Sequence, residues 1–191
     1  MLLEKLGRLC DYIMFDEAWA GFVKFHPLFK GRFAMGLEGL SSDHPGIICT
    51  QSTHKQLAGF SQASQIHVKD SHISGQSRQV EQRRFNEMFL LHASTSPFYP
   101  LFASLDVGAQ MMKGRSGQVL WDDTIRLGIE LRKKLRALKH EFEADLDPDR
   151  RWFFDPFVPD TVPAPGSAAG RIAWESVPTD LLASQPRYWE L

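Results

Sequence analysis

Short apolar runs predict three β-strands in the first 70 residues. Residues 12–15 are uniformly apolar and lie between two aspartates. Residues 46–50 follow a turn-like stretch of Ser, Asp, Pro and Gly, and residues 65–69 end at an aspartate. A short continuous run such as residues 12–15 is typical of a strand buried on both faces, as in a parallel sheet.

Helical spacing of apolar positions predicts the other elements. A leucine-rich helix precedes the first strand, a short helix joins the second and third strands, and three longer helices follow. We expect these helices at residues 2–9, 56–64, 85–91, 98–112 and 118–144. The fourth is largely apolar and is expected to be buried, whereas the fifth carries Lys, Arg and Glu on its other face, which is typical of an amphipathic helix.

The last quarter of the chain differs in composition. Pro and Gly become frequent from residue 146 onward, and the pattern gives strand-like pieces at residues 152–158 without an obvious core. We therefore expect residues 1–145 to form the main domain and residues 146–191 to be its Pro/Gly-rich continuation. Because strands and helices alternate, the predicted fold class is α/β, with a mainly parallel sheet flanked by helices.

The composition is that of an ordinary soluble globular protein. Hydrophobic residues make up 43% and charged residues 24% of the chain, and the formal net charge is −1, so neither nucleic acid nor a membrane is expected as a partner. No apolar run reaches the roughly 20 residues of a membrane span. The two cysteines are expected to be buried thiols in a reducing cytosol, and the seven histidines show no spacing typical of a metal site.

Polar side chains follow the first two predicted strands at the point where each strand ends. Asp16 follows the first apolar run directly, and Ser52-Thr53-His54-Lys55 follows the second strand. The carboxyl ends of strands are where α/β folds place ligand-binding groups. Hydroxyl and N–H groups at a helix start suit a phosphate, and a lysine amine can attack an aldehyde. The alternatives are structural, with Asp16 as a helix N-cap and Lys55 as a solvated surface lysine.

Three long segments resemble one known family, in the family's order. They are YIMFDEAW at residues 12–19, TQSTHKQLAGFSQASQIHVKD at residues 50–70 and FLLHASTSPFYPLFASLDV at residues 89–107, and the likeness continues through WFFDPF to the chain end. The chain resembles the bacterial ornithine/lysine/arginine decarboxylases, which are pyridoxal-phosphate enzymes of fold type I with an aspartate-aminotransferase-like large domain. The resemblance therefore implies pyridoxal 5'-phosphate as cofactor and makes residues 1–145 part of the cofactor-binding major domain.

The resemblance gives two residues a role in the chemistry. Lys55 would form the internal Schiff base with the cofactor, and Asp16 would pair with the pyridine nitrogen. The further cofactor contacts that it implies are Ala18 against the ring, Trp19 nearby, Ser52 and His54 on the phosphate, and Ser94 or Thr95 on the phosphate of a partner subunit.

This set of residues suits the loss of carbon dioxide from a basic amino acid. Decarboxylation leaves negative charge at Cα, and the cofactor ring accepts that charge while its nitrogen stays protonated. A carboxylate beside the nitrogen favours the protonated form. Asp16 and Lys55 occur in many enzymes of this fold, so the reaction type follows from the resemblance alone, and transamination stays open. Ornithine is the favoured substrate, with lysine and arginine as alternatives.

Members of the family are much longer than this chain. We therefore expect a fragment that is inactive or poorly soluble alone, because a sheet cut midway exposes unpaired edges. The resemblance implies a cytoplasmic enzyme that self-associates as a homodimer or a larger oligomer. A hypothesis of another class is a non-catalytic assembly partner or regulator with the same fold.

Overall fold

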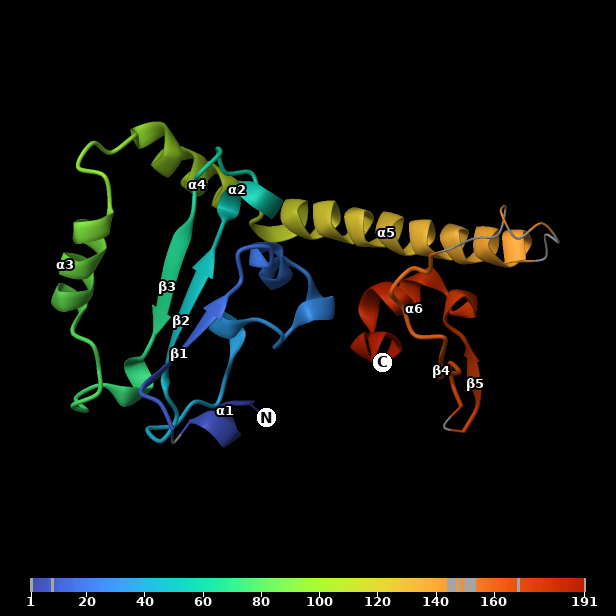
Figure 1. Cartoon of the computed structure of the whole chain (residues 1–191), viewed down its shortest axis with the longest axis horizontal. Coiled ribbons are helices and arrows are strands. Elements are labelled where there is room, and N and C mark those ends of the chain that lie inside the picture. Colours follow the sequence, from blue (N-terminus) through green and yellow to red (C-terminus); the bar gives the residue numbers. More distant parts are fainter. Residues whose placement is uncertain are drawn as a thin grey trace. The chain divides into compact units, whose positions relative to one another are not determined.

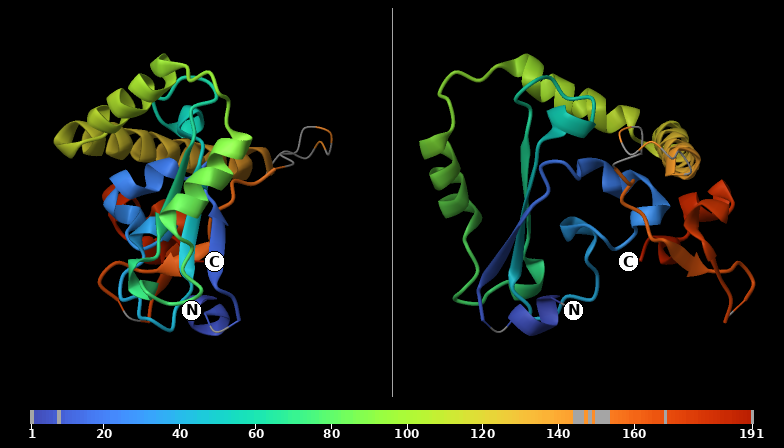
Figure 2. Two further views of the ribbon diagram at one scale, coloured as in Figure 1. Left: turned by 90° about the vertical axis from the view of Figure 1, so that its left-hand side faces the viewer. Right: turned by 45° about the vertical axis from the view of Figure 1, so that its right-hand side comes forward.

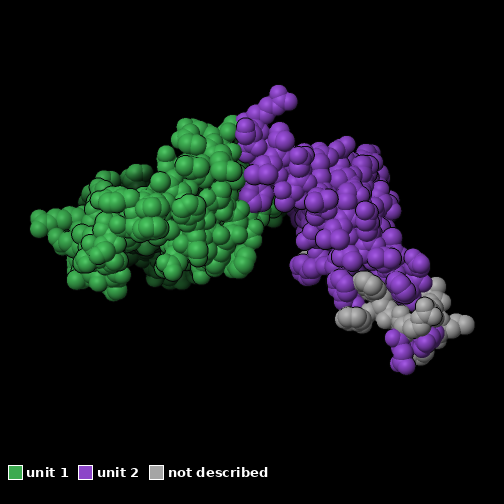
Figure 3. All heavy atoms as spheres, turned by 90° about the horizontal axis from the view of Figure 1, so that it is seen from above, with its two compact units in different colours: residues 1–25, 29–114 green, residues 26–28, 115–191 purple. Residues whose placement is uncertain are grey.

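The computed structural model describes residues 2–7, 9–143, 147, 149, 154–167 and 169–190. The chain divides into two compact units, one of Met1–Phe25 with Phe29–Gly114 and one of His26–Leu28 with Arg115–Leu191 (Figure 3). The boundary predicted at residues 145 and 146 falls on positions outside the described residues and stays a prediction. In the described ranges, no helix combines the length and the hydropathy needed to cross a membrane.

The first unit is built on a three-stranded sheet in the order β1–β2–β3 (Figure 1). The strands are β1 (Tyr12–Asp16), β2 (Gly46–Gln51) and β3 (Gln65–Lys69), which confirms all three predicted strands. β1 and β2 are parallel, with Asp16 opposite Thr50. β2 and β3 are antiparallel, with Cys49 opposite His67.

The prediction of a mainly parallel sheet is wrong for the described residues, which form a mixed α/β structure. The connection between β2 and β3 contains only α2 (Thr53–Gln56), whereas a parallel crossover usually needs a full helix across the sheet. The helix predicted at residues 56–64 is also wrong. The chain folds back on α2 after Leu57, so closely that a Cβ on Gly59 would lie 3.2 Å from the carbonyl carbon of Thr53.

One face of the sheet is covered by a core. The other, the open face, is only partly covered, where Val80 and Phe85 line a hollow of about 410 Å³ with Ile48 and Val68. Ile47 and Cys49 of β2 are fully buried against Leu3 of α1 (Leu2–Leu6) and Ala34 of η3 (Ala34–Gly36). On the alternate positions, the side chains of Met14, Ile66 and Val68 are exposed. Because side chains alternate along a strand, Asp16 shares the open face with Met14.

Two helices, α3 (Gln82–His92) and α4 (Tyr99–Met111), confirm the predictions at residues 85–91 and 98–112. α4 lies at the same end of the sheet as α2 (Figure 1, Figure 2), where Ser104 Oγ accepts a hydrogen bond from the Phe60 N–H at 3.1 Å. The expectation that α4 is a buried helix is wrong, since Phe102 and Val107 are more than half exposed. The apolar pattern of α4 predicted burial, but a pattern within one helix does not show whether another segment packs against it.

The second unit packs the C-terminal tail against α5 (Gly114–Glu143), which confirms the helix predicted from residue 118; residue 144 lies outside the described residues. The tail forms β4 (Thr161–Pro163), β5 (Arg171–Ala173) and α6 (Thr179–Ser184). No obvious core of its own was expected for the tail, and the core that it forms is shared with α5. It consists of Ile129 of α5 and of Val158, Val162, Trp174, Val177, Leu182, Ala183 and Tyr188 of the tail. Residues 154–158 form no strand, and residues 152 and 153 of that prediction are not described.

Candidate active site

Asp16 is the last residue of β1 and lies where the parallel strands β1 and β2 end. Its Oδ1 accepts a hydrogen bond from the Ala18 N–H at 3.0 Å, as in an Asx turn. The side chain is exposed, and within the described part of the chain no donor reaches Oδ2. Asp16 is not a helix N-cap, because the next helical turn, η1 (Gly21–Phe25), begins only at Gly21.

Lys55 lies on α2, and its exposed amine faces an aromatic ring. Nζ is 4.9 Å from the centroid of the Trp19 ring, within the range of about 6 Å for a cation–π interaction. Trp19 itself is 62% exposed. Since Trp19 follows Asp16 by three positions, this contact brings the predicted amine to the loop that follows the predicted carboxylate.

Ser52 and His54 are held beside Lys55 by backbone contacts. Ser52 directly precedes α2, its side chain makes no capping bond, and its carbonyl accepts the Lys55 N–H at 3.1 Å. His54 Nδ1 lies 2.9 Å from the carbonyl oxygen of Ala63. Because a carbonyl only accepts, Nδ1 of His54 carries the proton. Because Ser52 does not cap α2, its hydroxyl is available to bind a ligand.

The groups at this end of the sheet match those of pyridoxal phosphate. The aldehyde requires an amine such as that of Lys55, and a protonated ring nitrogen requires a carboxylate oxygen such as Asp16 Oδ2. A phosphate requires donors such as the Ser52 hydroxyl and, when both ring nitrogens of His54 carry protons, its Nε2–H. The four residues come from the ends of β1 and β2 and from α2. The residues that are present therefore fit this cofactor.

Ser94 and Thr95 lie elsewhere, on the exposed loop between α3 and α4. Ser94 Oγ accepts a hydrogen bond from the Ser96 N–H at 3.2 Å. No contact in the described ranges joins this loop to Asp16 or Lys55. The role of Ser94 or Thr95 toward a partner subunit stays a prediction.

Sequence reasoning missed Glu17, the neighbour of Asp16. The buried Cys49 thiol donates a hydrogen bond to Glu17 Oε2 at 3.1 Å. Burial, followed by this bond, raises the pKa of Cys49 to about 12, so the thiol keeps its proton at neutral pH. Cys10 is half-buried, and both cysteines are free. A second carboxylate directly after Asp16 was the signal in the sequence.

His67 lies on the core face of the sheet, away from the open face with Asp16. Burial lowers the pKa of His67, and the nearby Lys24 lowers it further, so the ring is neutral at physiological pH. His67 lines a hollow of about 210 Å³ together with Lys24, Gln51, Gln65 and Thr53, among others. The residues that line this hollow include none of Asp16, Ser52, His54 and Lys55.

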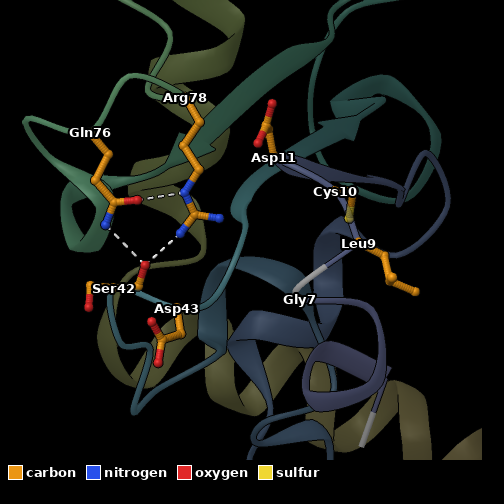
Figure 4. Close-up of a pocket in the computed structure, with 8 residues that line it drawn as sticks. All are labelled: Gly7, Leu9, Cys10, Asp11, Ser42, Asp43, Gln76 and Arg78. Carbon is orange, nitrogen blue, oxygen red and sulfur yellow. Dashed lines mark hydrogen bonds between the residues drawn. The ribbon is translucent and has the colours of Figure 1, made fainter.

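A larger hollow, of about 610 Å³, lies at the opposite end of the sheet (Figure 4). It is lined by Asp11, which precedes β1, and by Ser42, which precedes β2. Arg78 Nη2 and Gln76 Nε2 both donate to the Ser42 carbonyl, at 2.5 and 3.0 Å (Figure 4). These bonds tie the loop after β3 to the start of β2, so the polar groups here have a structural task.

Comparison with known proteins identifies close relatives of the whole chain. The family described as "Orn/Lys/Arg decarboxylase, major domain" matches residues 1–183. The constitutive ornithine decarboxylase of Escherichia coli (strain K12) is 46% identical over 188 residues, which is 98% of this chain and 24% of that protein. The ornithine decarboxylase of Haemophilus influenzae is 55% identical over 132 residues, 69% of this chain and 18% of that protein. The chain thus spans about a quarter or less of the length of these relatives.

Solved structures give the same relationship. The crystal structure of the Francisella novicida lysine decarboxylase LdcF matches with a TM-score of 0.62 and 43% identity, covering 77% of this chain and 18% of that one. The structure of E. coli constitutive lysine decarboxylase matches with a TM-score of 0.64 and 34% identity, covering 83% and 21%. This confirms the family that the three sequence segments indicate: the chain belongs to the Orn/Lys/Arg decarboxylases and matches their major domain.

Proposed function

We propose that this chain provides the lysine and aspartate of a pyridoxal-phosphate site in a decarboxylase for a basic amino acid. The observation that carries the proposal is the contact of the Lys55 amine with Trp19, three residues from Asp16, at the ends of β1 and β2. The likeness to decarboxylases over nearly the whole chain supports it. We propose fold type I for the domain to which these residues belong.

The chemistry divides between the cofactor and the chain. Pyridoxal phosphate, when bound, supplies an electron sink for the charge left at Cα as carbon dioxide leaves. Lys55 would hold the cofactor covalently through its aldehyde. Asp16 Oδ2 would accept a hydrogen bond from the protonated ring nitrogen and would favour the charged form of the ring. The Ser52 hydroxyl would donate to the phosphate, and His54 would donate through Nε2 when that nitrogen also carries a proton.

Ornithine is the substrate that we favour. Relatives named ornithine decarboxylases share 46% and 55% identity with the chain. Relatives named lysine decarboxylases share 38% (LdcA of Pseudomonas aeruginosa) to 43% (LdcF of Francisella novicida), and the biodegradative arginine decarboxylase of E. coli shares 36%. By the same likeness, we propose a cytoplasmic enzyme that works as a homodimer or larger oligomer.

Covalent labelling tests the cofactor site. The chain is incubated with pyridoxal phosphate, reduced with borohydride, digested and mapped by mass spectrometry. We expect the label on Lys55, and we expect Lys55→Ala to lose it. Lys30→Ala is the matched control, because Lys30 is an exposed lysine of the same unit. Label spread evenly over exposed lysines, unchanged by Lys55→Ala, would contradict the site.

A chimera tests the reaction. This chain replaces the matching 188-residue segment of the E. coli constitutive ornithine decarboxylase, and carbon dioxide release from ornithine, lysine and arginine is measured. We expect release from ornithine. Asp16→Ala in the chimera should lose on the order of 100-fold in kcat, as when one charge-stabilising group is removed. A folded, cofactor-loaded chimera that transfers the amino group without releasing carbon dioxide would contradict the decarboxylase proposal.

A further inference from the structure

One carboxylate joins three separate segments beside the proposed cofactor site. Glu17 Oε1 accepts the backbone N–H of Ala34 at 2.6 Å. Glu17 Oε2 accepts Gln51 Nε2 at 3.0 Å and the Cys49 thiol at 3.1 Å. The backbone N–H of Glu17 also donates to the Thr50 carbonyl at 2.9 Å. Glu17 therefore connects the end of β1, the end of β2 and the start of η3.

The position of these bonds matters more than their number. Glu17 is adjacent to Asp16, and its partner Gln51 is adjacent to Ser52, which leads into the helix that carries Lys55. The side-chain bond from Glu17 to Gln51 continues the β1–β2 pairing one step past the last paired positions, Asp16 and Thr50. The Glu17 side chain thus adds a contact between the two strand ends beyond the last backbone bond of the ladder, which runs from the Glu17 N–H to the Thr50 carbonyl.

The other partners anchor Glu17 to the core. Ala34 is 2% exposed and Cys49 is 0% exposed, so two of the three donors belong to the covered face of the sheet. A buried N–H or amide that loses its acceptor is costly, since no water replaces the bond. The Glu17 side chain is therefore held by the buried residues of the covered face, while the neighbouring Asp16 points to the open face.

We propose that Glu17 is a positioning residue that holds the ends of β1 and β2 at the separation at which Asp16 and Lys55 can engage one cofactor molecule. This inference rests on the proposed function, because it assigns the two residues to one ligand. Glu17 itself does not touch the cofactor. A purely structural role would change the stability of the chain without changing how pyridoxal phosphate is held.

The test compares Glu17→Gln with Glu38→Gln in the full 191-residue chain. Both changes remove one carboxylate, and Glu38 is exposed. At position 17 the new amide can still accept the Ala34 N–H, but its NH₂ group cannot accept from the Cys49 thiol, and Gln51 has to turn its amide to form a neutral bond in place of the charge-assisted one. We expect Glu17→Gln to need about tenfold more pyridoxal phosphate for half-maximal borohydride-trapped label on Lys55, the loss typical of one charge-assisted hydrogen bond. Glu38→Gln should label as the unmodified chain does.

Amide hydrogen exchange gives a readout without cofactor. The backbone N–H of position 17 reports the strand-end contact, because it donates to Thr50. We expect its exchange to rise about tenfold in Glu17→Gln and to stay unchanged in Glu38→Gln.

A double variant that swaps the two side chains controls for simple misfolding. In the double variant Glu17→Gln with Gln51→Glu, the donor and the acceptor trade places, and a charge-assisted bond between the strand ends forms again. We expect this variant to recover most of both the labelling and the amide protection. Labelling and exchange in Glu17→Gln equal to those of Glu38→Gln would overturn the inference, as would a failure of the double variant to recover either.

The outcomes separate the two claims. If the unmodified chain shows no label on Lys55, the proposed cofactor site fails, whatever Glu17 does. In that case amide hydrogen exchange at position 17 still tests whether Glu17 holds the ends of β1 and β2 together. Unchanged exchange in Glu17→Gln would show that it does not. If Lys55 is labelled equally in both single variants, the cofactor site stands and only the positioning role falls.

Discussion

Alkaline pH should destabilise the first unit through one buried thiol. Cys49 has no exposed surface, and burial, followed by the hydrogen bond to Glu17, raises its pKa from 9.0 to about 12. The folded chain therefore holds this proton more tightly than the unfolded chain does. At any pH between these two values, the unfolded state gains free energy by ionising and the folded state does not.

The size of the effect follows from the two pKa values. Each pKa unit corresponds to about 1.4 kcal/mol, so the stabilising contribution is at most about 4 kcal/mol. It is fully present below pH 9, where the thiol is protonated in both states. Between pH 9 and about 12 it is lost at about 1.4 kcal/mol per pH unit, because the unfolded state binds fewer protons there.

The assay is urea unfolding from about pH 8 to pH 11, for the unmodified chain and for Cys49→Ala. Tyrosines and lysines titrate in both proteins, so the difference in unfolding free energy isolates Cys49. We expect that difference to fall steadily above pH 9. A Cys10→Ala variant leaves Cys49 as the single thiol, so its ionisation in the folded chain can be followed by thiolate absorbance, with the Cys10→Ala and Cys49→Ala double variant as the blank.

Two results would refute this reasoning. Parallel stability curves for the unmodified chain and Cys49→Ala above pH 9 would show that the proton on Cys49 does not stabilise the fold. A pKa of Cys49 near its ordinary value in the folded chain would show that water reaches the thiol on β2.

Two further predictions concern the cores of the two units. Ile47→Ala should cost about 2–5 kcal/mol of unfolding free energy, because Ile47 is fully buried; Ile66→Ala, on the open face, should cost about 1 kcal/mol or less, and equal losses in urea melts would contradict the assignment of faces. In the second unit, buried Arg136 forms ion pairs with Asp155 at 3.2 Å and Asp160 at 3.0 Å. Changing both aspartates to asparagine should cost about 3 kcal/mol, since the guanidinium stays buried, whereas Arg136→Met should cost about 1 kcal/mol or less; the reverse order in the same assay would be the contrary result.

The strands were predictable because their pattern is local. Residues 12–15, 46–50 and 65–69 lie within one residue of β1, β2 and β3. The direction of β3 was not predictable in the same way, since an apolar pattern reads alike in both directions. Direction is set by the path of the connection, and that path depends on Gly59 folding the chain back against α2.

The candidate site shows the same division. Asp16 and Lys55 could be found from the sequence because each directly follows a strand and because the surrounding segments resemble a family. For Glu17 the sequence offers only its place next to Asp16, since its partners Ala34, Cys49 and Gln51 are distant in sequence. The tail core was missed for a related reason: its apolar residues have no single period, and they meet only when the tail packs on Ile129 of α5.

The two oxygens of Asp16 are not equivalent, and this bears on the choice of a mimic for it. Oδ1 is already engaged by the Ala18 N–H. An asparagine at this position would offer its lone carbonyl oxygen to that same N–H and would turn its NH₂ group outward. A protonated pyridine nitrogen would then meet a donor in place of an acceptor, so an isosteric replacement would oppose the ring charge instead of merely failing to stabilise it.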